Sequence, residues 1–312
     1  MRLMYGNHSK LKKPHTQVYS LGKQSLIAGS SSEELSEKLA TKLNMRIIRT
    51  QDFSFPDGEN KITLHGTLSD QEIVVVQSMY PPVNTNLVRA LSLVARAREA
   101  APKVTAIIPY MGYARQDRAF LTGEIITMKV LARLFKCAGA TKIVVVDMHS
   151  NAGLKHFKIK TLNITAIPEL VKYFKKMRLK NPLVVSPDKG GAGRAAEFAE
   201  RLKTDYIILA KQRNRKTGKV QITTKDPGHV KGRDMILVDD MVSTGGSIIS
   251  AAKLLKRQKC GKIYVACTHG LLVEGAEKKI KKAGVTKIIS TNTIPGNTAV
   301  VDVSLAIARA VR

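Results

Sequence analysis

The strongest constraint on the fold of this chain is the alternation of short apolar runs with longer segments of helical periodicity. Runs rich in Val and Ile lie at residues 72–78, 104–111, 142–148, 182–186, 235–238 and 262–267. Helix-like segments follow most of them, at residues 85–100, 127–140, 190–202, 246–258 and 271–284. Because the apolar runs are continuous, they predict strands buried on both faces, as in parallel sheets covered by helices. The pattern therefore indicates an α/β protein.

Two stretches of the chain repeat one order of elements. Residues 74–114 and residues 236–276 each run through a strand, a polar loop, a helix, a second strand and a glycine-containing loop. At 312 residues the chain is long enough for two domains with full cores. We therefore predict an N-terminal extension at 1–22, a first domain at 23–160 and a similar second domain at 161–312. Ser31 or Ser32 is placed to cap the first helix.

The chain is strongly basic. Its 52 Lys and Arg residues exceed its 24 Asp and Glu residues, giving a net charge of +28, and the excess is +9 in residues 1–155 but +19 in residues 156–312. Nucleic acid is one partner that such a charge attracts. However, aromatic residues make up only 5% of the chain, Trp is absent, and no zinc-finger, homeodomain or RNA-binding signature occurs. We therefore favour solvated helix faces and a site for small polyanions over a nucleic-acid interface.

No apolar run reaches the length of a membrane span, and the first twenty residues lack the apolar core of a signal peptide. The three cysteines have neither metal-site spacing nor an even number for disulfides. These features predict a protein of the cytoplasm with no membrane partner.

The stretch VDDMVSTGGS at 238–247 carries the clearest chemistry. It follows an apolar strand and opens a helix, which is where ligands of α/β sheets bind. Glycine N–H groups and hydroxyls there suit a phosphate, and two carboxylates before them suit sugar hydroxyls. A ribose phosphate fits this combination, although a plain helix cap and a turn would use the same residues. The candidate residues are Asp239, Asp240, Ser243, Thr244, Gly245, Gly246 and Ser247.

Two further stretches offer groups for a nucleotide. YARQDR contains Arg115, whose planar guanidinium suits phosphate oxygens or a base, followed by Gln116 and Asp117. FPDGE offers the apolar face of Phe55 with the carboxylates of Asp57 and Glu59. A surface salt-bridge cluster and an ordinary Pro-Asp-Gly turn are the alternatives.

Together these stretches resemble the ribose-phosphate diphosphokinase (PRPP synthase) family. VDDMVSTGGS alone is shared with type I phosphoribosyltransferases, but DFSFPDGEN, IPYMGYARQDR, VVVDMHS and VVSPDKGGAGRA match that family in type and order, from about residue 25 onwards. The resemblance implies two domains of the type I phosphoribosyltransferase fold, with the last helix crossing back onto the first domain. It also implies transfer of the β,γ-diphosphoryl group of ATP to ribose 5-phosphate, with Mg²⁺ as cofactor, in a homo-oligomer.

The resemblance assigns roles to single residues. Phe55, Asp57, Glu59, Arg115, Gln116 and Asp117 become ATP-side residues, and the FPDGE loop would reach ATP across a subunit interface. His149 and Asp188 become metal-side residues, although Mg²⁺ prefers oxygen ligands. Lys211 and Arg213 become the catalytic cations of an arm at 209–224 that folds over the reactants.

Two other functions remain open from the sequence. A phosphoribosyltransferase would need only one such domain and would leave YARQDR and FPDGE unexplained. A non-catalytic relative that regulates a synthase or binds nucleic acid would not need Lys211, Arg213, His149 and both aspartates, so their presence argues against it.

Overall fold

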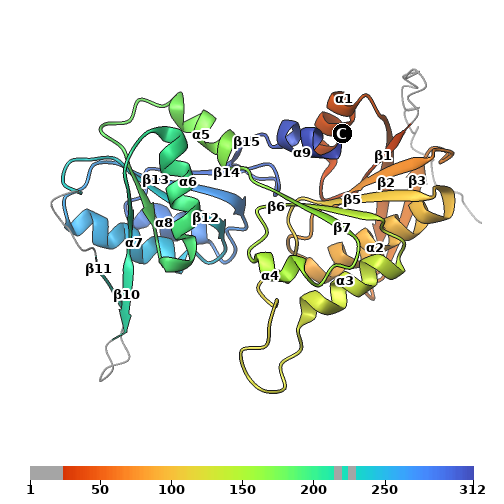
Figure 1. Cartoon of the computed structure of the whole chain (residues 1–312), viewed down its shortest axis with the longest axis horizontal. Helices are drawn as coiled ribbons and strands as arrows, with labels where there is room; N and C mark the ends of the chain where they lie inside the picture. Colours follow the sequence, from red (N-terminus) through yellow and green to blue (C-terminus); the bar gives the residue numbers. More distant parts are fainter. Residues whose placement is uncertain (1–23, 214–219, 224–229) are drawn as a thin grey trace, which may run out of the picture.

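The computed structural model describes residues 24–213, 220–223 and 230–312, and for residues 210–213 and 220–223 it describes only the backbone. The predicted N-terminal extension therefore lies outside the described residues. The chain forms two α/β halves that lie side by side (Figure 1). Two mostly parallel sheets flanked by helices confirm the predicted fold class.

The first half is built on a seven-stranded sheet of order β3-β2-β1-β4-β5-β6-β7, in which only the β2–β3 pair is antiparallel. Its strands are β1 (Ser25–Ala28), β2 (Arg46–Ser54), β3 (Asn60–His65), β4 (Glu72–Val76), β5 (Lys103–Ile108), β6 (Lys142–Val146) and β7 (Lys160–Ile164). Its helices are α1 (Glu33–Leu43), α2 (Val83–Ala100), α3 (Thr127–Cys137) and the short α4 (Asn151–Leu154).

The second half has a six-stranded parallel sheet of order β15-β14-β13-β12-β8-β9. Its strands are β8 (Leu183–Ser186), β9 (Tyr206–Ile208), β12 (Met235–Val242), β13 (Ile263–Gly270), β14 (Lys287–Thr291) and β15 (Ala299–Val301). Its helices are α5 (Ile167–Lys175), α6 (Ala192–Leu202), α7 (Gly246–Arg257), α8 (Ala276–Lys282) and α9 (Ser304–Val311), with a 3₁₀ turn, η1 (Lys189–Gly191), before α6. A separate antiparallel hairpin, β10 (Ala210–Arg213) and β11 (Val220–Thr223), extends away from this half in Figure 1.

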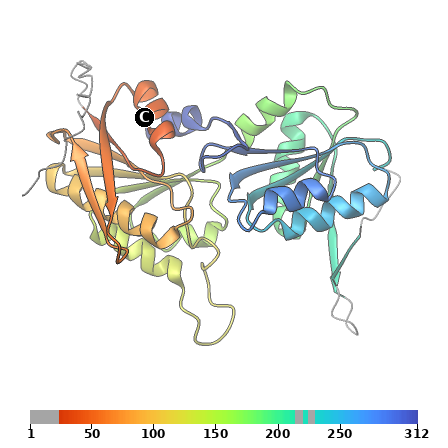
Figure 2. The same cartoon turned by 180° about the vertical axis from the view of Figure 1, so that it is seen from behind.

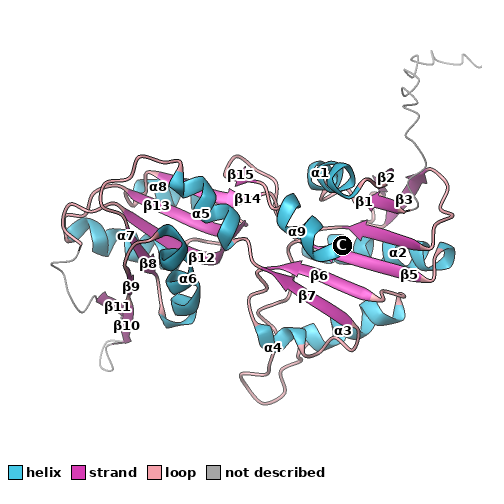
Figure 3. Cartoon of the chain, turned by 45° about the horizontal axis from the view of Figure 1, so that its top comes forward, coloured by secondary structure: helices cyan, strands magenta, loops and turns pink. Residues whose placement is uncertain are grey.

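The continuous apolar runs are buried on both faces, as their composition requires. In β4, Val74 and Val76 pack on the side of α1, while Ile73 and Val75 pack on the side of α2 and α3. In the second half, α5 and α6 cover one face of the sheet and α7 and α8 the other (Figure 2, Figure 3). Buried side chains thus hold each sheet between two helical layers.

Helix α9 lies against α1 of the first half and brings the end of the chain there (Figure 3). The Arg312 guanidinium donates to the carbonyl of Lys42, and Lys142 Nζ lies 3.5 Å from the carbonyl of Ala310. The predicted boundary between the two domains, near residue 160, stays a prediction. In the described part of the chain, no helix is long and apolar enough to cross a membrane.

The predicted serine cap of the first helix is wrong in its chemistry. Helix α1 does begin at Glu33, but Ser32 makes no side-chain capping bond. The Ser32 hydroxyl instead accepts from the N–H of Ser78, and the Ser31 hydroxyl donates to the Ser78 carbonyl. The two serines therefore fasten the β1–α1 loop to the end of β4.

Candidate functional site

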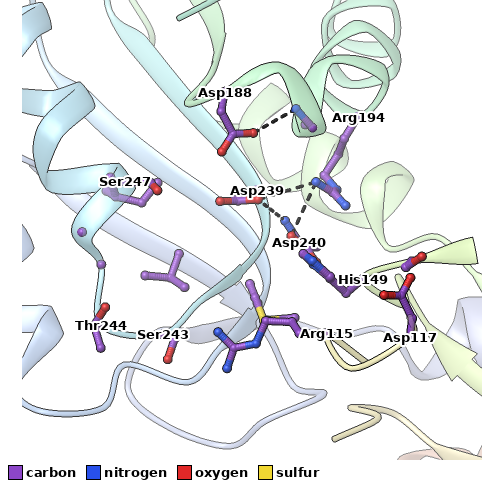
Figure 4. Close-up of a pocket in the computed structure, with 18 of the residues that line it drawn as sticks. Arg115, Asp117, His149, Asp188, Arg194, Asp239, Asp240, Ser243, Thr244 and Ser247 are labelled. Carbon is purple, nitrogen blue, oxygen red and sulfur yellow. Dashed lines mark hydrogen bonds and ion pairs between the residues drawn. The ribbon is translucent and has the colours of Figure 1, made fainter. Parts of the chain in front are cut away.

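A cavity of about 560 Å³ lies where the two halves meet (Figure 4). Its second-half lining comes mainly from the carboxyl end of β12 and the start of α7, and its first-half lining from the segments after β5 and β6. This is the edge at which open α/β sheets bind ligands. The lining contains these charged side chains: Arg115, Asp117, Arg118, His149, Asp188, Arg194, Asp239 and Asp240.

The loop from Ser243 to Ser247 forms one wall of the cavity, and its expected binding of phosphate stays a prediction. Gly245 has a φ of +79°, which favours glycine, and a Cβ there would lie 2.7 Å from Cδ1 of Ile280. A Cβ on Gly246 would meet nothing within 4 Å, so the space above this residue is open. The loop leads directly into the twelve-residue helix α7, and the N-terminus of a helix suits an anion.

The two aspartates of β12 differ in their surroundings. Asp240 is only 3% exposed, and its Oδ2 lies 2.7 Å from Nδ1 of His149. Asp239 is more open to the cavity, and its Oδ1 accepts from the N–H of Asp240. Nη1 of Arg194 lies 3.6 Å from a carboxylate oxygen of each (Figure 4). Both aspartates line the cavity, but Asp239 is the more exposed of the two, and one oxygen of Asp240 is already engaged by His149.

These contacts separate the acidities of the two carboxyl groups. Burial, together with the hydrogen bond and charge of Asp240, raises the pKa of Asp239 to about 7. Burial also opposes ionisation of Asp240, but the hydrogen bond from His149 and the charge of Arg194 outweigh it and lower the pKa of Asp240. The same hydrogen bond raises the pKa of His149. Between His149 and Asp240, the proton therefore resides on the histidine.

Asp188 faces the same cavity from the loop between β8 and α6. Its Oδ1 accepts from the N–H of Gly190 at 3.0 Å, and its carbonyl accepts from the Ser186 hydroxyl at 2.7 Å. A Cβ on Gly191 would lie 2.7 Å from Oγ of Ser186, so this turn requires glycine. The neighbouring Lys189 is exposed and does not line the cavity.

On the first-half side, the structure brings Arg115 and Asp117 to the cavity but not Gln116. Asp117 is 5% exposed, and among the described residues its Oδ2 has no hydrogen-bond partner. A buried carboxylate oxygen without a partner is costly and marks a position where a ligand donor fits. Arg118 and Phe120, which the sequence analysis did not select, also line the cavity and stack at 5.2 Å.

The structure does not bring the FPDGE residues to the cavity. Phe55, Asp57 and Glu59 lie in the turn between β2 and β3, and none of them lines it. The Phe55 ring packs edge-on against Phe53 at 4.9 Å, and Asp57 accepts from the N–H of Glu59. Their expected place across a subunit interface stays a prediction.

Lys211 and Arg213 lie in β10, where their side chains are outside the described residues. The strand backbone pairs Lys211 with Ile222 and Arg213 with Val220 of β11. Their catalytic roles therefore stay predictions.

Arg194 is another cavity residue that was not selected from the sequence. It lies in the first turn of α6, where a cation is unfavourable because the helix dipole is positive there. The position of this cation in the sequence could have indicated its role, because a cation at the start of a helix needs an anionic partner. Asp239 and Asp240 are those partners.

The metal-side residues form a sparse set. Within the described part of the chain, no group of three or more His, Cys, Asp or Glu side chains is close enough to hold a metal ion. Asp188 and His149 nevertheless line one cavity, and Nδ1 of His149 already contacts Asp240. Such a set fits Mg²⁺, which keeps several waters and usually takes one or two protein ligands together with substrate phosphates.

Two family models match the chain. The model of the N-terminal domain of ribose phosphate pyrophosphokinase matches residues 24–139, and the model of the phosphoribosyl transferase domain matches residues 154–307.

Individual relatives match over nearly their whole length. The chain is 36% identical to a ribose-phosphate pyrophosphokinase of Sulfolobus acidocaldarius, over 91% of this chain and 99% of that protein. It is 34% identical to one of Methanobrevibacter smithii, over 92% and 99%. Its fold is similar to the crystal structure of phosphoribosylpyrophosphate synthetase from Mycobacterium smegmatis, with a TM-score of 0.83, 28% identity, and coverage of 93% and 97%.

Proposed function

Because the chain belongs to the ribose-phosphate pyrophosphokinase family, we propose that it transfers the β,γ-diphosphoryl group of ATP to O1 of ribose 5-phosphate. The products are 5-phosphoribosyl 1-diphosphate and AMP. One observation carries this proposal beyond family membership. A phosphate-binding loop in the second half and the buried, unpartnered oxygen of Asp117 in the first half face a single cavity. Two substrates can therefore meet there.

Ribose 5-phosphate occupies the second-half wall. Its 5-phosphate accepts from the N–H groups and hydroxyls of residues 243–247, and its ring hydroxyls donate to Asp239. Asp240 contacts His149 and Arg194 and so holds these two side chains in place beside the bound sugar.

ATP occupies the first-half wall. Arg115 contacts the phosphates or the base, and Asp117 accepts a hydrogen bond from the nucleotide. We assign Phe55, Asp57 and Glu59 to the adenine side only in an assembly in which another copy of the chain presents them. Gln116 lies beside this wall and supports the loop, since its carbonyl accepts from the N–H of Met128.

The reaction forms a bond between O1 of the sugar and the β-phosphorus and breaks the bond between that phosphorus and the oxygen retained by AMP. The protein contributes position and charge in such a transfer. Lys211 and Arg213 supply positive charge to the migrating group, and Arg194 limits the repulsion between the two aspartates and the substrates.

The family implies Mg²⁺ as cofactor. Asp188 and Nε2 of His149 are the groups that would hold it, directly or through water, with the phosphates completing the coordination. A cation bound there would neutralise phosphate charge. We also propose, from membership of the family, that the protein is an enzyme of the cytoplasm and works as a homo-oligomer.

The test is AMP release from ATP and Mg²⁺, with and without ribose 5-phosphate, combined with ³¹P NMR of the sugar product. We expect AMP only with ribose 5-phosphate and a diphosphate on C1. Lys211→Ala should abolish turnover, whereas Lys278→Ala on the exposed face of α8 should leave it unchanged. Saturable ribose-phosphate binding without AMP would overturn the proposal and favour a phosphoribosyltransferase or a regulator.

A further inference from the structure

The two halves meet through hydrogen bonds between the ends of β6 and β13, one partly buried and one buried. Asp147 directly follows β6, and its Oδ2 accepts from the hydroxyl of Thr268 at 2.6 Å. The same oxygen accepts from the N–H of Ala166, which lies in the connection to the second half, at 2.9 Å. Thr268 is fully buried in β13. One carboxylate oxygen of the first half thus holds a strand of the second.

A second bond lies beside the first. Nε2 of His269 lies 2.9 Å from the carbonyl of Val146, the last residue of β6. Burial lowers the pKa of His269, so the ring is neutral and carries a single N–H. A carbonyl oxygen can only accept, so this N–H is on Nε2 and donates to Val146. The ring packs edge-on against Tyr110 of the first half at 5.0 Å. The end of β6 is therefore held by two consecutive residues of β13.

These contacts stand next to the cavity on both sides. In the sheet, Asp239 pairs with Cys267 and Met241 with His269, so Thr268 stands beside Asp240. In the first half, His149 follows Asp147 by two residues. Asp147 has a φ of 38°, in the left-handed region, which turns the chain out of β6 towards the cavity. The bond between Asp147 and Thr268 therefore connects the backbone that carries His149 to the strand that carries Asp240.

We propose that Thr268 is a positioning residue. Through Asp147 it fixes the first-half wall of the cavity, where the nucleotide binds, relative to the second-half wall, where ribose 5-phosphate binds. This inference rests on the proposed function, since it matters only where two substrates must meet. Each wall keeps its own ligand contacts when the bond is lost, because none of them passes through Thr268. The distance between the walls is what changes, and transfer between bound reactants is sensitive to misplacement of about 1 Å.

The kinetic test uses Thr268→Val, which keeps the shape of the side chain and removes the hydroxyl. We expect kcat to fall about tenfold to a hundredfold, with KM for each substrate within about twofold of the unmodified enzyme. Thr268→Ser, which restores a hydroxyl, should recover most of the loss. A kcat for Thr268→Val equal to that of the unmodified enzyme would overturn the proposal, as would a rise in KM that accounts for the whole effect.

A matched control separates positioning from simple loss of a buried hydroxyl. Thr298 is also buried, and its Oγ1 lies 2.8 Å from Oγ of Ser290, with both residues in the second half. Thr298→Val should lower the melting temperature to a similar degree and leave kcat unchanged. Equal losses of kcat in the two valine variants would assign Thr268 a structural role alone.

Amide hydrogen exchange tests the contact without any turnover. The N–H of Ala166 and the hydroxyl of Thr268 both donate to Oδ2 of Asp147. Thr268→Val removes the bond that ties this carboxylate to β13, so the junction should open more often and the Ala166 amide should exchange faster. Thr298→Val should leave this exchange rate unchanged. Exchange at Ala166 that is unchanged in Thr268→Val would show that the bond does not hold this junction. If the unmodified protein released no AMP, the proposed function would fail by itself, and the exchange result would still decide whether the bond joins the halves.

Discussion

Nδ1 of His149 lies 2.7 Å from Oδ2 of Asp240, and the two residues are separated by 91 positions in the chain. One belongs to the segment after β6 in the first half and the other to β12 in the second. The contact therefore forms only when both halves are folded and correctly placed. It also couples a residue of the first-half wall of the cavity to a residue of the second-half wall.

This contact predicts the titration of His149. The hydrogen bond to Asp240 raises the pKa of His149 above its ordinary 6.5, so Asp240→Asn should move it back down. Two-dimensional NMR of the imidazole in Mg²⁺-free buffer measures both values. A His149 pKa that does not change in Asp240→Asn would contradict the assigned contact.

The same contact gives stability with a defined sign. Because the folded pKa of His149 is raised, its contribution is fully present below pH 6.5 and disappears as the pH rises through the folded value. His149→Gln should therefore cost more free energy of unfolding at pH 6 than at pH 9. Urea unfolding at the two pH values measures the difference, and an equal cost at both would count against protonation of the pair.

Removing the charge of Asp239 should increase the free energy of unfolding. Burial raises its pKa from 3.8 to about 7, so the ligand-free protein loses stability as the pH rises from about 4 through 7. Asp239→Asn should be more stable than the unmodified protein at pH 8, by roughly 1–2 kcal/mol after allowance for solvent, with little gain at pH 4.5. Differential scanning calorimetry without Mg²⁺ checks this.

The gain should be accompanied by loss of function. Asp239 lines the cavity and is the carboxylate that we propose binds the sugar hydroxyls, so the same variant should bind ribose 5-phosphate weakly and turn over slowly. A variant that is both more active and more stable, or one destabilised at pH 8, would exclude the role assigned to Asp239.

The sequence allowed the strand, the glycine turn and the start of α7 to be predicted because their signals are local: an apolar strand, two glycines and a helix start lie within about fifteen residues. Phosphate binding by this loop stays a prediction. The sequence did not predict that Asp239 and Asp240 differ in burial, partners and acidity. That distinction depends on His149 and Arg194, which reach β12 from other elements, and adjacent identical residues carry no local sign of such partners.

The misplaced serine cap has a similar cause. Ser32 has the residue type and position of a cap, and in an isolated helix it would serve as one. The end of β4 offers the N–H of Ser78 as a competing donor, and this tertiary partner is invisible at a distance of 46 positions. Local patterns therefore predicted the elements and the loop, whereas contacts between elements decided the roles of individual side chains.

Gly245 tests the shape of the phosphate loop. Gly245→Ala should destabilise the protein by about 1–2 kcal/mol, because alanine is strained in the left-handed region and its Cβ would clash with Ile280. Ribose 5-phosphate binding measured by calorimetry should weaken as well. Gly246→Ala is the matched comparison: the space around it is open and alanine favours the helix, so its free energy of unfolding should not decrease. Similar destabilisation in both variants would show that the positive φ of Gly245 is not what the loop requires.

Arg194 provides the sharpest test of the charge arrangement, because its guanidinium faces both aspartates at 3.6 Å. Arg194→Met leaves two neighbouring carboxylates without their shared cation, which should cost about 2–3 kcal/mol at pH 8 and lower kcat/KM for ribose 5-phosphate. Arg194→Lys should recover only part of the loss, since a single ammonium cannot present the planar fork of donors to two carboxylates. Arg201→Met is the control on the same helix: Arg201 is exposed and pairs with Glu197, so its loss should cost no more than about 0.5 kcal/mol. Urea unfolding and steady-state kinetics compare the three variants. If Arg194→Met behaved like Arg201→Met, the two aspartates would be compensated by some other group, and the separation of their acidities would need a different cause.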